Sequence, residues 1–482
     1  ETELTYMLDY LRSVFPRVLP VLDARLREAW CAAGGNAERL RTPEAYPRLR
    51  FGDWVGGDRD GHPFVTPRVT ANTLARLRAN AIEVIATQLD ELQDALSLSD
   101  LFQTPPPFFT AALQGKLQQA SPAAAAATEA LPHEPWRQYV MLMRHALPGD
   151  TPAAGGYTRP DDLLADLAVL RQSLDAVGAA RLAGAYVLPL ERSVQCFGFH
   201  TAALDIRQNS NFHDRALVQL AAAAGLDLSG WPTWPEGRRR EWLATELDSL
   251  RPLAPPRAQL GPEAAAVVDT LRALADYREA HGPAGIGAYI VSMTRDLSDL
   301  LLVYLFAREA GLLQAAGDGP ICALSVVPLF ETVDDLARAP GILGDYLAHP
   351  LVRRSLTCED GVSVQQVMVG YSDSNKGSGI FASQWRLNRA QHALAEVARE
   401  QGVQVQFFHG RGGTIGRGAG PTHRFLESLA HGSLTGHFRL TEQGETIAQK
   451  YGNIPTAEYN LELLMAGVTA TTIKHREPFA LD

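Results

Sequence analysis

The chain has 482 residues, too many for a single ordinary hydrophobic core, and its 46% hydrophobic and 20% charged content is typical of a soluble globular protein. The formal net charge of −10 argues against a nucleic-acid partner. No apolar run reaches the roughly 18 residues of a membrane span. The four cysteines lack the paired spacing of a zinc site or a disulfide framework, so we expect a cytoplasmic protein.

Residues 1–195 are predicted to form a mainly helical region. Apolar residues recur at helical spacing in Leu11–Ala29, Leu74–Leu96 and Leu163–Leu174. The loop Trp54–Pro63 interrupts this region, and its Gly-Gly and Asp-Gly pairs predict a tight turn. One interpretation is a structural loop in which Asp58, Arg59 and Asp60 pair with one another. His62 is expected at the surface.

Residues 196–482 are predicted to form a barrel region. Apolar, β-branched runs alternate there with long helical patterns, which predicts a parallel sheet with right-handed crossovers. The regular spacing favours a (βα)8 TIM-type barrel over an open sheet, within a helix-rich α/β fold. About six strands of the barrel are visible: Thr201–Ile206, Gly287–Met293, Leu324–Phe330, Val367–Tyr371, Val403–Phe408 and Phe438–Leu440.

Polar residues cluster just past each predicted strand. In (βα) barrels, catalytic residues come from the carboxyl ends of several strands and converge there. Strand ends are also polar because they meet water, but that explanation accounts for one or two clusters more easily than for all of them. The clusters are Arg207-Gln208, Arg295-Asp296, Glu331-Thr332, Ser372–Lys376, His409–Arg411 and Thr441–Gln443.

The stretch Phe407–Pro421 is the most informative in the chain. Its six glycines permit positive φ angles and close approach of the backbone to a ligand. Exposed backbone N–H groups and the start of a helix favour an anion, and Arg411 and Arg417 add planar guanidinium groups suited to phosphate or carboxylate. His409 can transfer a proton near neutral pH. The alternative is a flexible glycine loop without a ligand.

Glu331 and Asp373 are candidate metal ligands because each follows an apolar strand directly. Two carboxylates with open coordination positions suit Mg²⁺ or Mn²⁺. Both also precede predicted helices, so helix capping is the alternative. Lys376 is either a cation near developing negative charge or an ordinary solvated lysine. With Arg207 and Arg411, a metal here suits a small phosphorylated, carboxylated substrate.

Taken together, several stretches resemble phosphoenolpyruvate carboxylases. The resemblance extends over nearly the whole chain, and the set in this order is highly specific. The stretches are Trp54–Pro63, Leu204–Ser210, Val327–Thr332, Val367–Lys376, Phe407–Pro421 and Arg439–Glu445.

The resemblance implies a function and an assembly. Enzymes of this family form oxaloacetate and phosphate from phosphoenolpyruvate and bicarbonate, through carboxyphosphate and a metal-stabilised enolate, in anaplerotic carbon fixation. Their (βα)8 barrel lies among many helices, and they are usually homotetramers. The cofactor is Mg²⁺ or Mn²⁺, and aspartate or malate is a possible inhibitor.

The resemblance also implies roles for individual residues. His409, Arg411, Lys376 and Arg207 would be catalytic. Glu331 and Asp373 would hold the metal ion, and Arg417 would bind the inhibitor. The substrate-binding residues would be Arg207, Arg411, Gly412, Gly413 and Gln443.

The chain departs from the family pattern in ways that leave alternatives open. An upstream Thr-Ala-His-Pro-Thr-Glu motif and the family's C-terminal part are absent, so we expect this chain to be part of a longer polypeptide whose two further barrel strands lie before and after it. Gly377 replaces an Asp of the family pattern, and His62 replaces an Asn. The alternatives are another phosphoenolpyruvate-using barrel of the dikinase type and an inactive core fragment that lacks the complete active site.

Overall fold

The computed structural model describes residues 2–149, 155–255, 258–359, 361–372, 374–375, 379–412 and 420–477. Its N-terminal part is helical, and many of its helices begin at proline. Proline suits the first helical turn because the N–H group it lacks would have no partner there. The α-helices of this part are α1 (Thr2–Asp9), α2 (Phe15–Ala32), α3 (Pro67–Ala95), α4 (Pro107–Gln119), α5 (Pro122–Thr128), α6 (Pro135–His145), α7 (Pro160–Ala176), α8 (Ala180–Leu182) and α9 (Leu188–Phe197).

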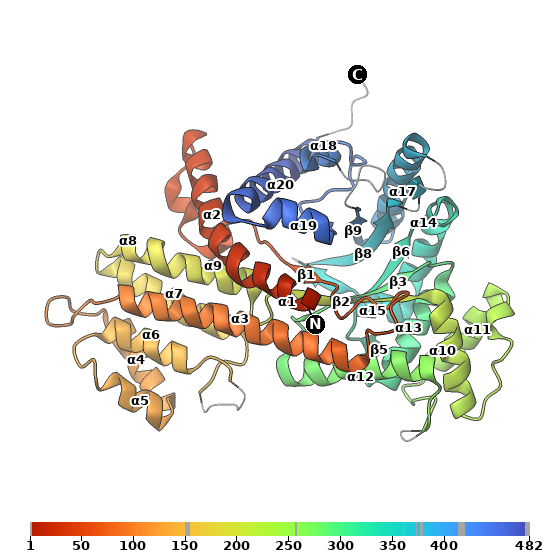
Figure 1. Cartoon of the computed structure of the whole chain (residues 1–482), viewed down its shortest axis with the longest axis horizontal. Helices are drawn as coiled ribbons and strands as arrows, with labels where there is room; N and C mark the ends of the chain where they lie inside the picture. The colour runs from red at the N-terminus through yellow and green to blue at the C-terminus, as the bar shows by residue number, and fades with distance from the viewer. Residues whose placement is uncertain are drawn as a thin grey trace.

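A curled parallel sheet forms the centre of the molecule (Figure 1). Among the described residues, seven strands follow the order β1-β2-β3-β6-β8-β9-β10, and every neighbouring pair is parallel. This is an arc of a TIM-type barrel, as predicted. The strands are β1 (Gly52–Asp53), β2 (Ala203–Asn209), β3 (Ile286–Ser292), β6 (Val326–Phe330), β8 (Val362–Gly370), β9 (Gln404–Gly410) and β10 (Arg439–Leu440).

The structure corrects the sequence prediction at β1. This strand lies inside the region predicted to be mainly helical, and it pairs with β2 through Gly52 and Ala203. The barrel strand that was expected to precede this chain is therefore β1, which lies within it. A two-residue strand has no periodicity of its own, so only its pairing with β2 reveals it. Short antiparallel pieces also escaped prediction: β4 (Leu313–Ala316) with β5 (Gly319–Cys322), and β7 (Thr357–Glu359) with β8.

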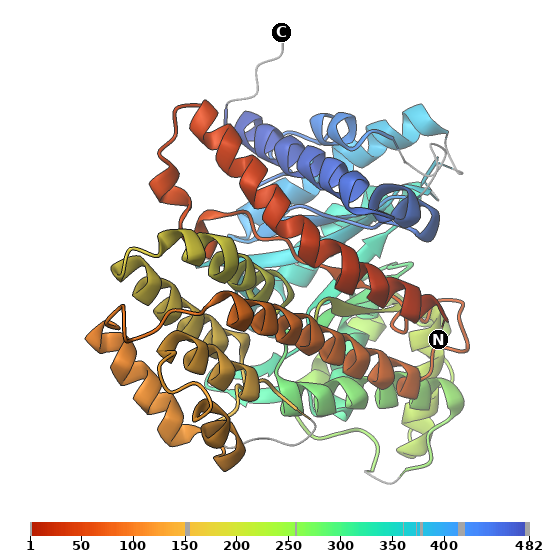
Figure 2. The same ribbon diagram turned by 60° about the vertical axis from the view of Figure 1, so that its left-hand side comes forward.

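Helices cover the outer side of the arc and close one of its ends. In Figures 1 and 2, α2 lies beside α20, and the ion pair between Arg25 and Glu458, 3.2 Å apart, joins them. The helices that alternate with the strands or follow them are α10 (Ser210–Ala223), α11 (Glu236–Leu247), α12 (Pro262–His281), α13 (Leu297–Glu309), α14 (Val333–Ala348), α15 (Pro350–Ser355), α17 (Ile380–Glu400), α18 (Thr422–Glu427), α19 (Gly444–Tyr451) and α20 (Ile454–Arg476).

Side chains alternate between the two faces of each strand, and both faces are apolar. A small inner cluster includes Ile290, Leu329, Met368 and Phe408, with Trp54 packed against it. The outer faces of the same strands join the main core beneath the helices. Burial on both faces is typical of parallel sheets, and it means that an apolar residue does not by itself reveal which face it occupies.

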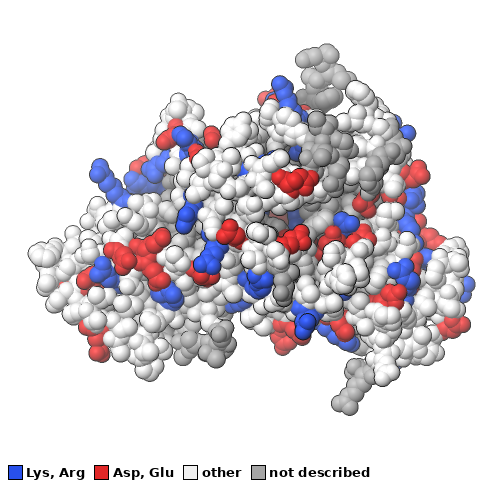
Figure 3. All heavy atoms as spheres, in the orientation of Figure 1, with Lys and Arg blue, Asp and Glu red and all other residues white. Residues whose placement is uncertain are grey.

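A separate apolar cluster lies among the N-terminal helices. It gathers residues of α3, α4, α6, α7 and α9, with Trp136 and Tyr139 at its centre. On the face of the molecule shown in Figure 3, acidic and basic side chains are interspersed. Within the described ranges, no helix combines the length and the apolar character needed to cross a membrane.

Candidate active site in the barrel cavity

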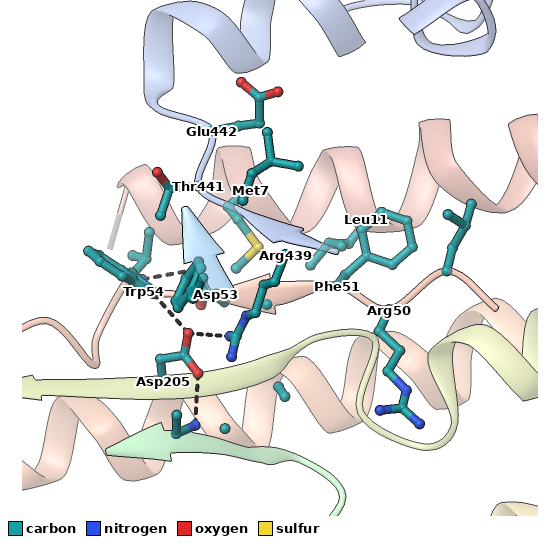
Figure 4. A pocket seen from close by; sticks show the side chains of 18 of the residues that line it. Met7, Leu11, Arg50, Phe51, Asp53, Trp54, Asp205, Arg439, Thr441 and Glu442 are labelled. Atoms are coloured by element: carbon teal, nitrogen blue, oxygen red, sulfur yellow. Dashed lines mark hydrogen bonds and ion pairs between the residues drawn. The ribbon is translucent and has the colours of Figure 1, made fainter. Parts of the chain in front are cut away.

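A cavity of about 2330 Å³ opens along the inner face of the arc. Its walls come from inward-facing strand residues, from the loop Trp54–Pro63, and from α1, α2 and α20 (Figure 4). Of the predicted site residues, Arg207, Glu331 and Gln443 line it. The structure thus brings residues from three distant segments to one space, as the strand-end clusters predict.

Arg207 lies within β2, because this strand runs to Asn209 and is longer than predicted. Its inward position is set by pairing on both sides: Arg207 is opposite Ile290 of β3 and forms an isolated parallel bridge with Asp58. Burial alone would lower the pKa of Arg207, but Asp58, Asp60 and Glu331 outweigh burial and raise it. The guanidinium group therefore stays charged in the cavity wall.

The loop Trp54–Pro63 reaches Arg207 directly, which corrects the expected pairing within the loop. Asp60 Oδ2 lies 2.9 Å from Arg207 Nη2, and Asp58 Oδ1 lies 3.5 Å from Arg207 Nε. Arg59 instead donates to Thr270 from its buried side chain. The carboxylates pair with Arg207 because the β-bridge brings β2 alongside the loop. His62 is exposed, as expected.

A second ion pair lies deeper on the inner face. Asp205, only 1% exposed, accepts hydrogen bonds from Trp54 Nε1 at 2.9 Å and from the backbone N–H of Ala288 at 2.8 Å. Arg439 Nη2 of β10 lies 2.5 Å from the same carboxylate (Figure 4). Nearby Asp53 is also buried, and burial raises its pKa to about 7 despite the hydrogen bonds from the backbone N–H groups of Val55 and Trp54.

Glu331 follows β6 and points into the cavity. It does not cap the next helix, because Thr332 is the N-cap residue of α14: its hydroxyl accepts from the N–H of Asp335, whose carboxylate accepts from the N–H of Thr332. Glu331 Oε2 accepts a long hydrogen bond of 3.4 Å from the backbone N–H of Met293. A carboxylate in the cavity wall that is not used for capping fits a hard divalent cation. In the described part of the chain, no three His, Cys, Asp or Glu residues cluster around a metal-sized space.

His409 lies inside β9 rather than after it, because pairing with Val369 on one side and Leu440 on the other extends the strand to Gly410. Its side chain is 2% exposed and does not line the cavity. The ring stacks on Phe438 at 5.1 Å and contacts Phe425 at 5.3 Å. Burial, with the charge of Arg411, lowers the pKa of His409 to about 3, so the ring is neutral near pH 7.

The neutral ring of His409 ends a short chain of hydrogen-bonding groups. Gln391 Nε2 donates to the hydroxyl of Tyr371 at 3.3 Å, and this hydroxyl lies 2.9 Å from His409 Nδ1. Burial raises the pKa of Tyr371, so its hydroxyl keeps its hydrogen and can donate it to Nδ1. Such a donation corresponds to the tautomer of His409 with its ring proton on Nε2.

Arg411 belongs to the same aromatic cluster. Its guanidinium lies 4.0 Å from the centre of the Phe425 ring and donates to the carbonyl of Gly420 at 3.2 Å. Burial lowers its pKa, while Tyr371 and Glu442 oppose that effect. The side chain is 5% exposed and does not line the cavity. His409 and Arg411 therefore share one cluster, whereas Arg207 and Glu331 share the cavity.

The remaining predicted site residues divide into two groups. Gly412 follows Arg411 and is partly buried, and Gln443 lines the cavity at the start of α19. The positions outside the described residues are Asp373, Lys376, Gly413 and Arg417.

One polar strand end has a structural use. Arg295, after β3, lies 2.6 Å from Asp299 and 2.8 Å from Asp214, and it does not line the cavity. Asp296 caps α13 by accepting from the N–H of Leu297. This cluster ties α10 to α13, so not every polar strand end belongs to the site.

Asp205, Trp54 and Arg439 also belong to the cavity wall, although they were not predicted as site residues. A signal for Asp205 was present: it lies two residues before Arg207 in a strand, so both side chains occupy the same face. A carboxylate on a buried strand also needs a partner. The sequence did not show that this partner lies 234 residues away in β10.

The arc of parallel strands and its charged cavity define an α/β protein of the (βα)-barrel class. The chain matches the family model described as phosphoenolpyruvate carboxylase over residues 1–480. It belongs to the phosphoenolpyruvate carboxylase family.

Curated relatives carry the same name. The chain is 37% identical to a phosphoenolpyruvate carboxylase of Mycobacterium leprae, over 98% of this chain and 50% of that protein. It is 37% identical to that of Nocardia farcinica, over 100% of this chain and 52% of the relative. It is 36% identical to the phosphoenolpyruvate carboxylase of Methylorubrum extorquens, over 97% of this chain and 51% of that relative. The chain thus spans about half the length of these curated relatives.

Proposed function

We propose that the protein containing this chain is a phosphoenolpyruvate carboxylase, which forms oxaloacetate and phosphate from phosphoenolpyruvate and bicarbonate. The observation that carries this proposal is the placement of Arg207 and Glu331 in the wall of one cavity at the carboxyl ends of β2 and β6. A fixed guanidinium and a carboxylate suited to a cation match a phosphorylated substrate that is bound together with a metal ion. Membership of the family supports the same reaction.

Arg207 binds the substrate phosphate in this proposal, with Arg411 as a second phosphate ligand. Gly412, Gly413 and Gln443 contact the substrate, and Gln443 already lies in the cavity wall. Lys376 supplies a cation near the reacting groups.

Glu331 and Asp373 hold Mg²⁺ or Mn²⁺. The position of Glu331 in the cavity wall supports this role, and Thr332 rather than Glu331 caps α14. When bound, the cation stabilises negative charge that develops on the substrate oxygens. Arg207, whose raised pKa keeps it cationic, neutralises the phosphate beside it.

His409 assists carboxyl transfer. Its ring lies in a water-poor aromatic cluster outside the cavity lining and is neutral, so in this proposal it acts as a neutral group rather than as a permanent cation. Tyr371 and Gln391 form the hydrogen-bonded chain that ends at this ring.

Arg417 binds aspartate or malate as an inhibitor, and the protein is a cytoplasmic homotetramer. The division into a helical region, 1–195, and a barrel region, 196–482, is part of the same proposal. Resemblance to the family supports these statements.

A non-catalytic role for this segment alone is the second candidate. The observation that favours it is length, because the chain covers about half of its curated relatives. An enzyme of the dikinase type is a further alternative, and it would use phosphoenolpyruvate without bicarbonate.

A coupled assay for oxaloacetate on the full-length protein separates these possibilities. We expect turnover that requires both phosphoenolpyruvate and bicarbonate, and a large loss of activity in Arg207→Gln and His409→Asn. Arg240→Gln is the matched control, because Arg240 forms a surface ion pair with Asp345 and does not line the cavity. Bicarbonate-independent turnover would indicate the dikinase type. No turnover would indicate a binding remnant, and unchanged activity in His409→Asn would remove His409 from the mechanism.

A further inference from the structure

We infer that Asp60 is a positioning residue for Arg207: it holds the guanidinium group from outside the cavity lining, so that the group presents its remaining N–H donors to the anion in the cavity. This inference rests on the proposed function, because it assigns the phosphate of the substrate to Arg207.

The contacts of Asp60 join it to the guanidinium and to β3, and it does not belong to the cavity lining. Its Oδ2 accepts from Arg207 Nη2 at 2.9 Å and from the hydroxyl of Ser292 at 2.7 Å. Arg207 lines the cavity, whereas Asp60 and Ser292 do not. Ser292 is fully buried at the end of β3. β3, the strand next to β2, therefore holds the carboxylate of Asp60, and this carboxylate in turn holds Arg207.

Two further contacts restrict the guanidinium in other directions. Asp58 Oδ1 lies 3.5 Å from Nε, and the Trp54 ring centre lies 5.4 Å from the guanidinium carbon. These contacts leave Nη1, which has no hydrogen-bond partner among the residues with described positions. The hydrogen bond at Nη2 fixes the guanidinium, Nε has only the ion-pair contact with Asp58, and Nη1 is offered to an anion in a defined direction.

The backbone holds this arrangement together. The N–H of Arg59 donates to the carbonyl of Arg207 at 2.9 Å, and the N–H of Arg207 donates to the carbonyl of Gly57 at 3.1 Å. The backbone of the loop and the backbone of β2 are thus hydrogen-bonded to each other at the residue that binds the anion. The two carboxylates of Asp58 and Asp60 face the single positive charge of Arg207, but of these two carboxylates only that of Asp58 lines the cavity. The placement of Asp60 outside the cavity lining favours positioning over competition with the anion.

Steady-state kinetics of the full-length protein test this role. For Asp60→Asn we expect KM for phosphoenolpyruvate to rise roughly tenfold, as for other supporting residues, while kcat falls less than about threefold and KM for bicarbonate stays unchanged. Ser292→Ala should shift the same parameter in the same direction by a smaller factor, and Asp60→Glu should restore part of the loss because it keeps the charge. The matched control is Asp345→Asn, which removes an equally short pair, 2.7 Å from Arg240, on the surface.

An unchanged KM for phosphoenolpyruvate in Asp60→Asn would overturn the inference, and a lower KM would show that Asp60 competes with the phosphate instead. An equal loss in kcat and in both KM values, together with a lower melting temperature, would show a structural role only.

Calorimetric titration with inorganic phosphate separates this inference from the proposed function. If the wild-type protein binds phosphate without carboxylase activity, the proposed function fails, and weaker phosphate binding by Asp60→Asn still supports positioning. If the wild-type protein is a carboxylase and Asp60→Asn binds phosphate as tightly as the wild type, the inference alone fails.

Discussion

Arg439 Nη2 lies 2.5 Å from Asp205 Oδ2, so one ion pair joins β10 and β2 across the inner face of the sheet (Figure 4). In the strand order β2 is second and β10 is last. Arg439 also donates to Gln366 Oε1 at 2.8 Å, and its guanidinium lies 4.1 Å from the centre of the Phe408 ring. The pair therefore holds the arc in its curled form from the inside.

Removal of Arg439 should destabilise the protein. In Arg439→Met the carboxylate of Asp205, 1% exposed, keeps its hydrogen bonds from Trp54 and Ala288 but loses its counter-charge. We expect the free energy of unfolding in urea to fall by about 3 kcal/mol. Arg50→Met is the control: Arg50 pairs with Glu359 but is 64% exposed, so its loss should cost less than about 1 kcal/mol. Equal losses in the two variants would contradict a bridging role for Arg439.

Gly57→Ala should damage the contact between the loop and β2. A Cβ atom at position 57 would lie 1.9 Å from the backbone oxygen of Asp205, so the loop would have to move away from β2. This movement would disrupt the contacts between the loop and Arg207. We expect a loss of at least about 2 kcal/mol in unfolding free energy and weaker phosphate binding in calorimetry. Gly237→Ala, at an open helical position, should be neutral or slightly stabilising. Wild-type phosphate binding in Gly57→Ala would show that the close approach is dispensable.

Glu331→Gln should weaken binding of the divalent cation while the fold is retained. The change keeps the size of the side chain but removes the charge that a hard cation requires, and the cap of α14 depends on Thr332 instead. We expect Mn²⁺ affinity, measured by electron paramagnetic resonance of free Mn²⁺, to fall by roughly a hundredfold. Asp334→Asn, in the first turn of the same helix, should leave it unchanged. Undiminished Mn²⁺ binding by Glu331→Gln would exclude this residue as a ligand.

The buried His409 should make the fold sensitive to acid. Its pKa is lowered to about 3 in the folded protein, so below about pH 6.5 the unfolded chain binds a proton that the folded protein does not. The stability contributed by the neutral ring is thus complete above pH 6.5 and is lost as pH falls toward 3. Between pH 7 and pH 5 this loss amounts to about 2 kcal/mol.

The measurement is urea unfolding of wild type and His409→Asn at both pH values. The variant should lose about 2 kcal/mol less than the wild type on going from pH 7 to pH 5. His392→Asn, with a side chain that is 59% exposed on α17, should behave as the wild type does. A His409→Asn variant with the full wild-type pH dependence would show that the ring is protonated in the folded protein.

Much of the fold could be predicted from the sequence because its signals are local. Strand and helix patterns alternate at regular spacing from residue 200 onward, and the predicted strands correspond to β2, β3, β6, β8, β9 and β10. The two-residue β1 could not be predicted in this way, because its identity depends on pairing with β2, about 150 residues later.

The candidate site, like the fold, could be predicted from the sequence only in part. The sequence by itself determined the family, through motifs such as Val327–Thr332, and predicted that Arg207 and Glu331 lie near the carboxyl ends of strands. Only the tertiary structure decided that His409 lies behind the sheet while its neighbour Phe408 faces the interior. The reason is that a parallel sheet is buried on both faces, so Phe407 and Phe408 give no periodic signal to orient the strand. The pairing of Asp60 with Arg207, and of Arg439 with Asp205, likewise joins segments more than a hundred residues apart, which no local pattern encodes.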